Sequence, residues 1–83
     1  MSINKVLDER GSRYGSFDGN ARTVQACLDV LMAGDNAIVL KYYHKEAMHM
    51  IVHKLARIVN GDADYADSWV DIAGYAQLVV RHI

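Results

Sequence analysis

The stretch that decides the fold is EAMHMIVHKLARIVNGDADYADSWVDIAGYAQLVV, residues 46–80. Apolar residues recur in its first half every three or four positions, which predicts a helix over Tyr43–Val59 that ends at Asn60-Gly61. The same spacing in its second half predicts a helix over Tyr65–His82. Because the connection NGDAD is short, the two helices should form an antiparallel hairpin. The expected apolar side of the second helix holds Trp69, Ile72, Ala73, Ala76, Val79, Val80 and Ile83.

The charges of the hairpin predict its register. Residues 37–60 carry four Lys or Arg and one Glu, whereas residues 61–83 carry four Asp and one Arg. A turn centred near Asp62 places Arg57 beside Asp67 and Lys54 beside Asp71. Asp62 or Asp64 is expected to cap the second helix. Trp69 is expected to be buried with its indole N–H hydrogen-bonded.

The rest of the chain is expected to add helices and no sheet. Ser2 caps a short helix that Gly11 should stop, and the glycine-rich segment 11–20 reads as a loop. A second helix is predicted over Asn20–Ala33. The segment AIVLKYY has no partner strand, so it should be a turn that leads into the hairpin. The sequence therefore predicts an all-α fold: a single domain, residues 1–83, built as a small bundle of three to four helices.

Composition narrows the protein class. The 52% hydrophobic and 23% charged fractions are typical of a globular chain. A chain of this length buries little more than about 60% of its unfolded surface, so a homo-oligomer, most simply a dimer, should supply further burial. Tyr75 and Leu78 lie outside the apolar stripe, which also favours a second contact surface. The net charge of −1 makes nucleic acid an unfavourable partner.

The sequence also predicts the cellular compartment of the protein. "MSINKVLDER" lacks the apolar segment of a signal peptide, and no apolar run approaches the length of a membrane span. Cys27 is the single cysteine, which excludes an internal disulfide, and it is expected to be a small buried apolar residue. These features predict a cytoplasmic protein with no membrane association.

Two groups of side chains are candidates for metal binding. Asp67 and Asp71 are four residues apart and could hold Mg²⁺ together with substrate phosphates. The alternative is a structural role, in which they pair with Arg57 and Lys54. Glu46, His49 and His53 also share one helix, but the pattern lacks the glutamate that directly follows the first histidine in zinc proteases. The alternative for these histidines is solvation or pairing with carboxylates.

The segment RGSRYG (Arg10–Gly15) is a candidate phosphate loop. Backbone amides between two glycines, together with the side chain of Arg13, could hold a phosphate group. It matches no P-loop or dinucleotide fingerprint, so a plain turn is the alternative. The predicted ligand-binding residues are Arg13, Tyr14, Lys54, Arg57, Asp67 and Asp71.

Three motifs carry a resemblance to a known family. ERGSRYGSF, EAMHMIVHKLARIVNGD and YADSWVDIAGYAQL resemble, in this order, the motifs of a family of short uncharacterised proteins found mainly in tailed bacteriophages and prophages. The resemblance implies a phage-encoded protein that acts in the infected cell. It carries no established activity.

A more distant similarity is to the all-helical MazG-like nucleotide pyrophosphohydrolases. These hold Mg²⁺ with paired carboxylates on two helices, whereas Glu46 has no acidic partner on its own helix. Two kinds of function follow. The first is a binding module for a host protein or for a nucleotide or other phosphate-bearing ligand. The alternative is a Mg²⁺-dependent pyrophosphohydrolase assembled across a dimer.

Overall fold

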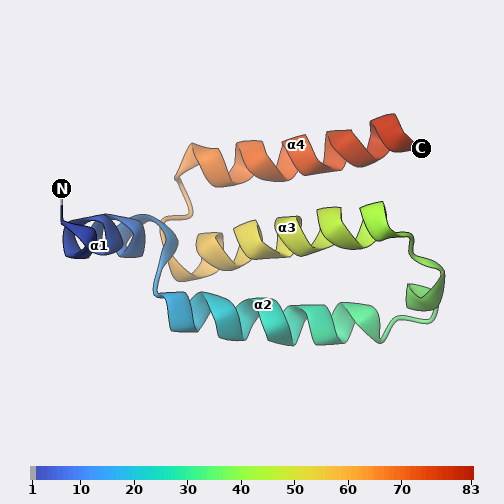
Figure 1. Cartoon of the computed structure of the whole chain (residues 1–83), viewed down its shortest axis with the longest axis horizontal. Helices are drawn as coiled ribbons and strands as arrows, with labels where there is room; N and C mark the ends of the chain where they lie inside the picture. Colours follow the sequence, from blue (N-terminus) through green and yellow to red (C-terminus); the bar gives the residue numbers. More distant parts are fainter. Residues whose placement is uncertain (1) are drawn as a thin grey trace.

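The computed structural model describes residues 2–83, which form four α-helices and one 3₁₀ turn and contain no strand. Helices α2, α3 and α4 lie side by side with α3 in the middle, and α1 lies at one end of this layer (Figure 1). The prediction of an all-α bundle with a C-terminal hairpin is confirmed. None of the described helices combines the length and the apolar character needed to cross a bilayer. The elements are α1 (Ile3–Tyr14), α2 (Phe17–Met32), η1 (Ala37–Val39), α3 (Tyr42–Asn60) and α4 (Ala66–His82).

The first half of the chain is more helical than the sequence predicts. Ser2 caps α1 as expected, and its hydroxyl accepts a hydrogen bond from the Lys5 amide. Gly11 does not stop the helix, which continues to Tyr14, because a single helical glycine costs only about 1 kcal/mol. The expected loop over residues 11–20 is therefore wrong, and only Gly15 and Ser16 separate the two helices. The Ser16 hydroxyl caps α2 by accepting from the Gly19 amide.

The α1–α2 turn and the α3–α4 turn cross in close backbone contact. Gly15 has a φ of +83°, a conformation that other residues rarely adopt. A Cβ atom on Gly61 would lie 2.5 Å from the Arg13 carbonyl oxygen, and one on Gly15 would collide with the Asn60 carbonyl. The Asp62 amide donates to the Arg13 carbonyl at 2.9 Å. Two glycines thus allow the C-terminal end of α1 to rest on the hairpin turn.

The hairpin register is confirmed at one of its two predicted ion pairs. Lys54 Nζ lies 3.3 Å from Asp71 Oδ2, and the Lys54 side chain is only 13% exposed. The predicted Arg57–Asp67 pair does not form within residues 2–83, because the Arg57 guanidinium stacks on a tyrosine ring instead. At the opposite end of the hairpin, the rings of Tyr43 and His82 stack with centroids 4.1 Å apart.

Helix α4 is rotated about its axis relative to the predicted orientation. Ser68, Ile72, Tyr75 and Val79 turn toward α3 as the buried or half-buried positions of α4. Trp69 is therefore 52% exposed, so its expected burial is wrong, although its indole N–H donates to the Ala63 carbonyl as predicted.

The expected cap of α4 is also wrong. Tyr65 occupies the N-cap position, and the Asp62 carboxylate caps the turn by accepting from the Asp64 amide.

The hydrophobic core is small for the size of the chain. Val24, Val52 and Ala56 form its centre, and Cys27 and Leu28 pack against them as half-buried residues. The chain exposes 6123 Å², about 1,100 Å² more than the roughly 5,000 Å² expected for a monomer of this mass. Its radius of gyration of 14.4 Å also exceeds the roughly 12 Å of a compact domain of this length. The layer therefore leaves much apolar surface uncovered.

Replacing Gly61 by Ala should destabilise the fold. The added methyl group would meet backbone atoms of Arg13, Tyr14 and Gly15, which have no room to move without separating the two turns. We expect a loss of about 2 kcal/mol in the free energy of unfolding, measured by urea denaturation. Gly74→Ala is the matched control: its methyl group meets open space, so helix propensity should raise stability by about 0.5–1 kcal/mol. Equal effects of the two substitutions would contradict the close crossing.

A double-mutant cycle tests the hairpin register. Lys54→Met and Asp71→Asn should couple by about 0.5 kcal/mol, a modest value because the Asp71 side chain is 47% exposed. The control cycle pairs Lys54→Met with Asp67→Asn, for which we expect no coupling. Coupling of Lys54 to Asp67 in place of Asp71 would shift the register by one turn and refute this geometry.

Candidate functional site

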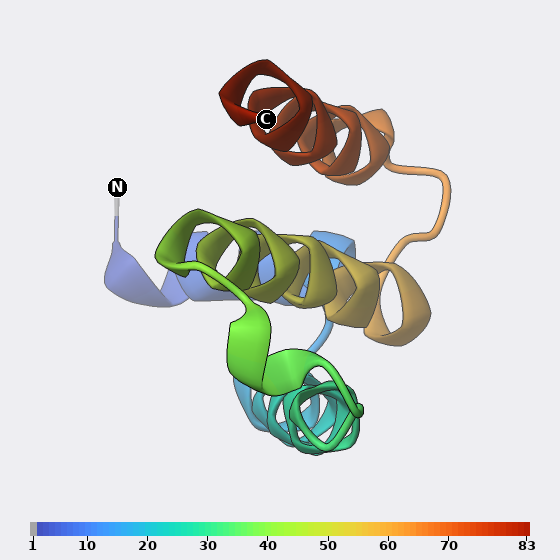
Figure 2. The same cartoon turned by 90° about the vertical axis from the view of Figure 1, so that its right-hand side faces the viewer.

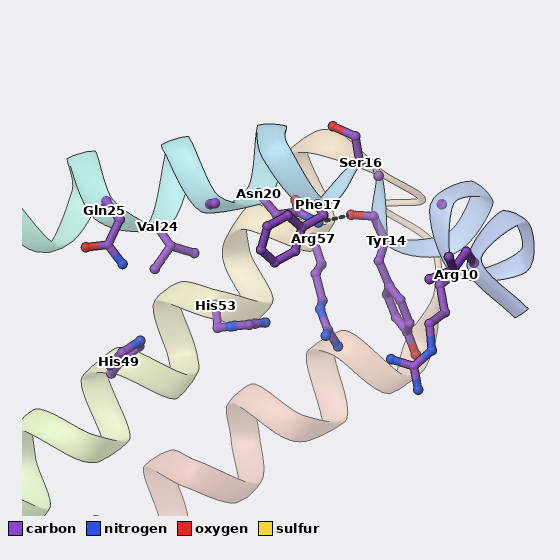
Figure 3. A pocket seen from close by; sticks show the side chains of 14 residues that line it. Arg10, Tyr14, Ser16, Phe17, Asn20, Val24, Gln25, His49, His53 and Arg57 are labelled. Atoms are coloured by element: carbon purple, nitrogen blue, oxygen red, sulfur yellow. Dashed lines mark hydrogen bonds between the residues drawn. The ribbon is translucent and has the colours of Figure 1, made fainter. Parts of the chain in front are cut away.

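A pocket of about 710 Å³ opens between α1, α2 and α3. Its floor is apolar, with Val24 and Ala21 from α2 and Leu7 from α1. Figure 3 shows polar side chains from all three helices around it. The volume lies within the range of about 300–1,000 Å³ found for sites of small ligands. The polar lining consists of Arg10, Tyr14, Ser16, Asn20, Gln25, His49, His53 and Arg57.

One helix supplies a regular stripe of basic side chains to this pocket. His49, His53 and Arg57 are spaced four residues apart on α3, so they share one side of that helix. Arg10 reaches the pocket from α1, and no Asp or Glu belongs to the lining. The pocket therefore offers positive charge and hydrogen-bond donors with no competing carboxylate, which is the chemistry that binds an anion.

The electrostatics of His53 follow from its neighbours. Partial burial lowers the pKa of His53, and the positive charges of Arg57 and Lys54 and the nearby His49 lower it further. The folded chain thus disfavours the charged imidazolium at this position. An anion in the pocket would act in the opposite direction, because negative charge stabilises the protonated ring.

Arg57 is held in place by an aromatic stack at the crossing of the turns. Its guanidinium lies 4.2 Å from the centroid of the Tyr14 ring. Tyr14 meets Tyr65 edge-on with centroids 5.7 Å apart, and the Arg13 guanidinium lies 4.6 Å from the Tyr65 ring. Each cation–π contact at a partly exposed position contributes about 0.5–1 kcal/mol. Four side chains from α1, α3 and the start of α4 are thereby ordered around the pocket end.

Hydrogen bonds of two asparagine side chains connect the wall of the pocket to the crossing of the two turns. Asn20 donates to the Tyr14 carbonyl at 2.6 Å. Asn60 Nδ2 donates to Asn20 Oδ1 at 3.1 Å and to Thr23 Oγ1 at 3.0 Å. These bonds tie the first turns of α2 to the last residue of α3. The lining is therefore pre-formed by the fold.

The structure divides the six predicted ligand-binding residues into two groups. Tyr14 and Arg57 line the pocket. Arg13 lies outside the lining. Residues 10–14 are helical, so they cannot form the predicted phosphate loop of backbone amides. Lys54 pairs with Asp71 between α3 and α4. Asp67 lies in the first turn of α4, where its carboxylate raises the pKa of the Tyr65 hydroxyl as hydrogen-bond acceptor and negative charge.

Few side chains within residues 2–83 are arranged so that they could bind a metal ion together. No three His, Cys, Asp or Glu side chains there come close enough together to hold one metal ion. Asp67 and Asp71 offer two carboxylates on α4, and their binding of Mg²⁺ stays a prediction. His49 and His53 share the pocket, but Glu46 is not part of its lining.

Sequence reasoning missed Asn20 and Gln25 as lining residues, and it placed Arg10 in the candidate phosphate loop without naming it as a ligand-binding residue. The four-residue spacing of His49, His53 and Arg57 was a usable signal, since polar side chains repeated on one side of an otherwise apolar helix face something other than the core. Asn20 had no such signal, because it ends the segment that the sequence predicts to be a loop.

Comparison with known families identifies the family of the chain but no activity. The model of the family described as "Domain of unknown function (DUF6378)" matches residues 2–82. Comparison with curated proteins and with solved structures gives no match. The expectation of an uncharacterised family is confirmed, while the phage origin stays a prediction. The chain belongs to the DUF6378 family.

Proposed function

We propose that this protein binds a small phosphate-bearing ligand, of the nucleotide class, in the pocket between α1, α2 and α3. The observation that carries the proposal is the lining itself, in which Arg10, His49, His53 and Arg57 converge and no carboxylate is present. Phosphate groups are bound in proteins by arginine and by charge-assisted hydrogen bonds of this kind.

Arg57 is the best placed of these groups to bind phosphate. No carboxylate pairs with it in the part of the chain that the structure describes. Its contact with Tyr14 uses the face of the guanidinium, so the N–H groups at the edge stay available to an anion. The stack also restricts its rotamers, which reduces the entropy lost on binding.

The apolar part of the pocket suits the remainder of a nucleotide. Phe17 lines the pocket and is 89% exposed, so a planar base could stack on its ring. Asn20 and Gln25 supply amide groups for the edges of a base or sugar. A ligand that carries both phosphate and a flat ring therefore matches both halves of the lining.

Binding is favoured over hydrolysis by the position of the acids. A Mg²⁺-dependent pyrophosphohydrolase needs carboxylates at the phosphates to hold the metal. Asp67 and Asp71 lie on α4, outside the lining of this pocket. Turnover of a bound nucleotide would instead support the alternative inferred from the MazG-like similarity.

The biological setting is proposed on the motif resemblance alone. We infer a phage-encoded protein that works in the cytoplasm of the infected cell. A host protein is a further proposed partner, because several large apolar side chains remain exposed.

Calorimetric titration of the full chain with nucleoside triphosphates, with and without Mg²⁺, tests the proposal. Arg57→Gln should weaken binding about tenfold or more, because it removes a charge-assisted contact that contributes about 1.5–3 kcal/mol. Arg13→Gln is the matched control, since Arg13 also stacks on a tyrosine of the same cluster but lies outside the pocket lining. We expect its affinity to match that of the unmodified chain.

Two results would contradict the proposal. Absence of binding by every triphosphate, by pyrophosphate and by inorganic phosphate would reject it. Equal losses for Arg57→Gln and Arg13→Gln would move the site away from the pocket. Nucleosides without phosphate serve as the negative ligand control.

The lowered pKa of His53 predicts a pH dependence of stability. The unfolded chain binds the proton more tightly than the folded chain, so the free energy of unfolding is highest above about pH 6.5 and falls as the pH drops through the folded pKa. Urea denaturation at several pH values should show this decrease, and His53→Gln should reduce it. A bound anion should also reduce it, because it stabilises the protonated ring. The same decrease in His53→Gln as in the unmodified chain would refute this assignment.

A further inference from the structure

The layer of α2, α3 and α4 has two sides, and only one of them carries a further helix (Figure 2). Helix α1 and the pocket lie on one side of the layer. On the opposite side, Figure 2 shows no helix among the described residues. On this second side, the flanks of α3 and α4 have no helix of the described residues packed against them.

The contacts within the hairpin identify which residues of α3 lie on that side. His53 and Arg57 point to the pocket side, while Ala47 and Ile58 are buried next to α4. By helical periodicity, the remaining flank of α3 holds the apolar residues Met48, Ile51, Leu55 and Val59, and His44 lies one turn before Met48.

The same reasoning applies to α4. By helical periodicity, Lys54 and Tyr43 lie between the pocket side of α3 and the side that holds Ile58. They contact Asp71 and His82, which therefore mark the pocket-side flank of α4. Ile72 and Val79 face α3 itself. The opposite flank therefore holds Trp69, Ala73, Ala76, Val80 and Ile83. Together with Met48, Ile51, Leu55 and Val59, these residues are named the apolar face.

The apolar face has the spacing of a helix–helix contact. Its α4 residues follow one another at intervals of four, three, four and three, the repeat that packs one helix seam against another. No member is charged, and Val59, Trp69 and Val80 are 70%, 52% and 64% exposed. Two adjacent antiparallel helices with such stripes form half of a four-helix bundle.

The excess exposed surface of the whole chain is large enough to include one interface of standard size. The chain exposes about 1,100 Å² beyond the expectation for a monomer of its mass, and a standard interface takes about 800 Å² from each partner. A stripe without charges brings no like charges together when it meets its own copy, so two copies can meet through the same residues around a twofold axis.

We propose that a second copy of this chain covers the apolar face, so that two α3–α4 hairpins form an isologous four-helix bundle. The pocket lies on the other side of the layer and stays open in both copies. The proposal rests on the apolar face alone, so it stands or falls independently of the proposed ligand.

The mass of the full chain in solution tests the interface. Sedimentation equilibrium should give twice the 9.3 kDa chain mass for the unmodified protein. Val80→Glu should halve that mass while circular dichroism still shows the helices. Leu78→Glu is the matched control on the pocket-side flank of α4, where Leu78 is 56% exposed, and it should keep the double mass.

Trp69 gives a second readout that needs no substitution. It is the single tryptophan of the chain and lies on the apolar face, so its emission should shift to longer wavelength as dilution halves the mass. This measurement decides the case if Val80→Glu fails to fold. The proposal is overturned by a mass of one chain at all concentrations. It is equally overturned by Trp69 emission that stays unchanged through dissociation, or by a dimer that Leu78→Glu breaks and Val80→Glu keeps.

Discussion

The close crossing of two backbone turns is the constraint on which the rest of the structure depends. Gly15 and Gly61 let the α1–α2 turn and the α3–α4 turn touch, and the Asp62 amide bonds to the Arg13 carbonyl there. Any larger side chain at Gly61 would separate the turns. Because all four helices begin or end near this point or are connected through it, the crossing orients the hairpin, places α1 across its end and shapes the pocket.

The same crossing explains why the basic groups of the pocket are available to a ligand. With α1 resting on the hairpin turn, Tyr14 lies against the guanidinium of Arg57, and the asparagines at positions 20 and 60 join α2 to α3. Arg57 is therefore held by an aromatic ring instead of the predicted carboxylate of Asp67. A guanidinium that is positioned but not neutralised is suited to binding an anion, whereas one in an ion pair would first have to break it.

Three helices in one layer form a thin core, and this has consequences on both sides. Only five apolar residues are buried within residues 2–83, so the layer itself covers little surface. On one side, α1 converts the open surface into a pocket with a basic lining. On the other, the flanks of α3 and α4 stay apolar, and a second copy is proposed to cover them. Because the layer is thin, each of its sides is left with exposed surface: the proposed ligand binds on one side, and the proposed second copy binds on the other.

The sequence by itself determined the elements that depend on local spacing: the helical class, the cap at Ser2, the hairpin and the Lys54–Asp71 pair. Apolar periodicity and short connections are properties of neighbouring residues, so they can be read from the chain. Only the tertiary structure decided that Gly11 is helical, that Trp69 faces outward, and that Arg10 and Asn20 join His49, His53 and Arg57 around one pocket. The pocket depends on α1 docking against the distant turn at Gly61, and the orientation of Trp69 depends on how α4 packs on α3. Contacts between separate segments leave no periodic signal in either segment.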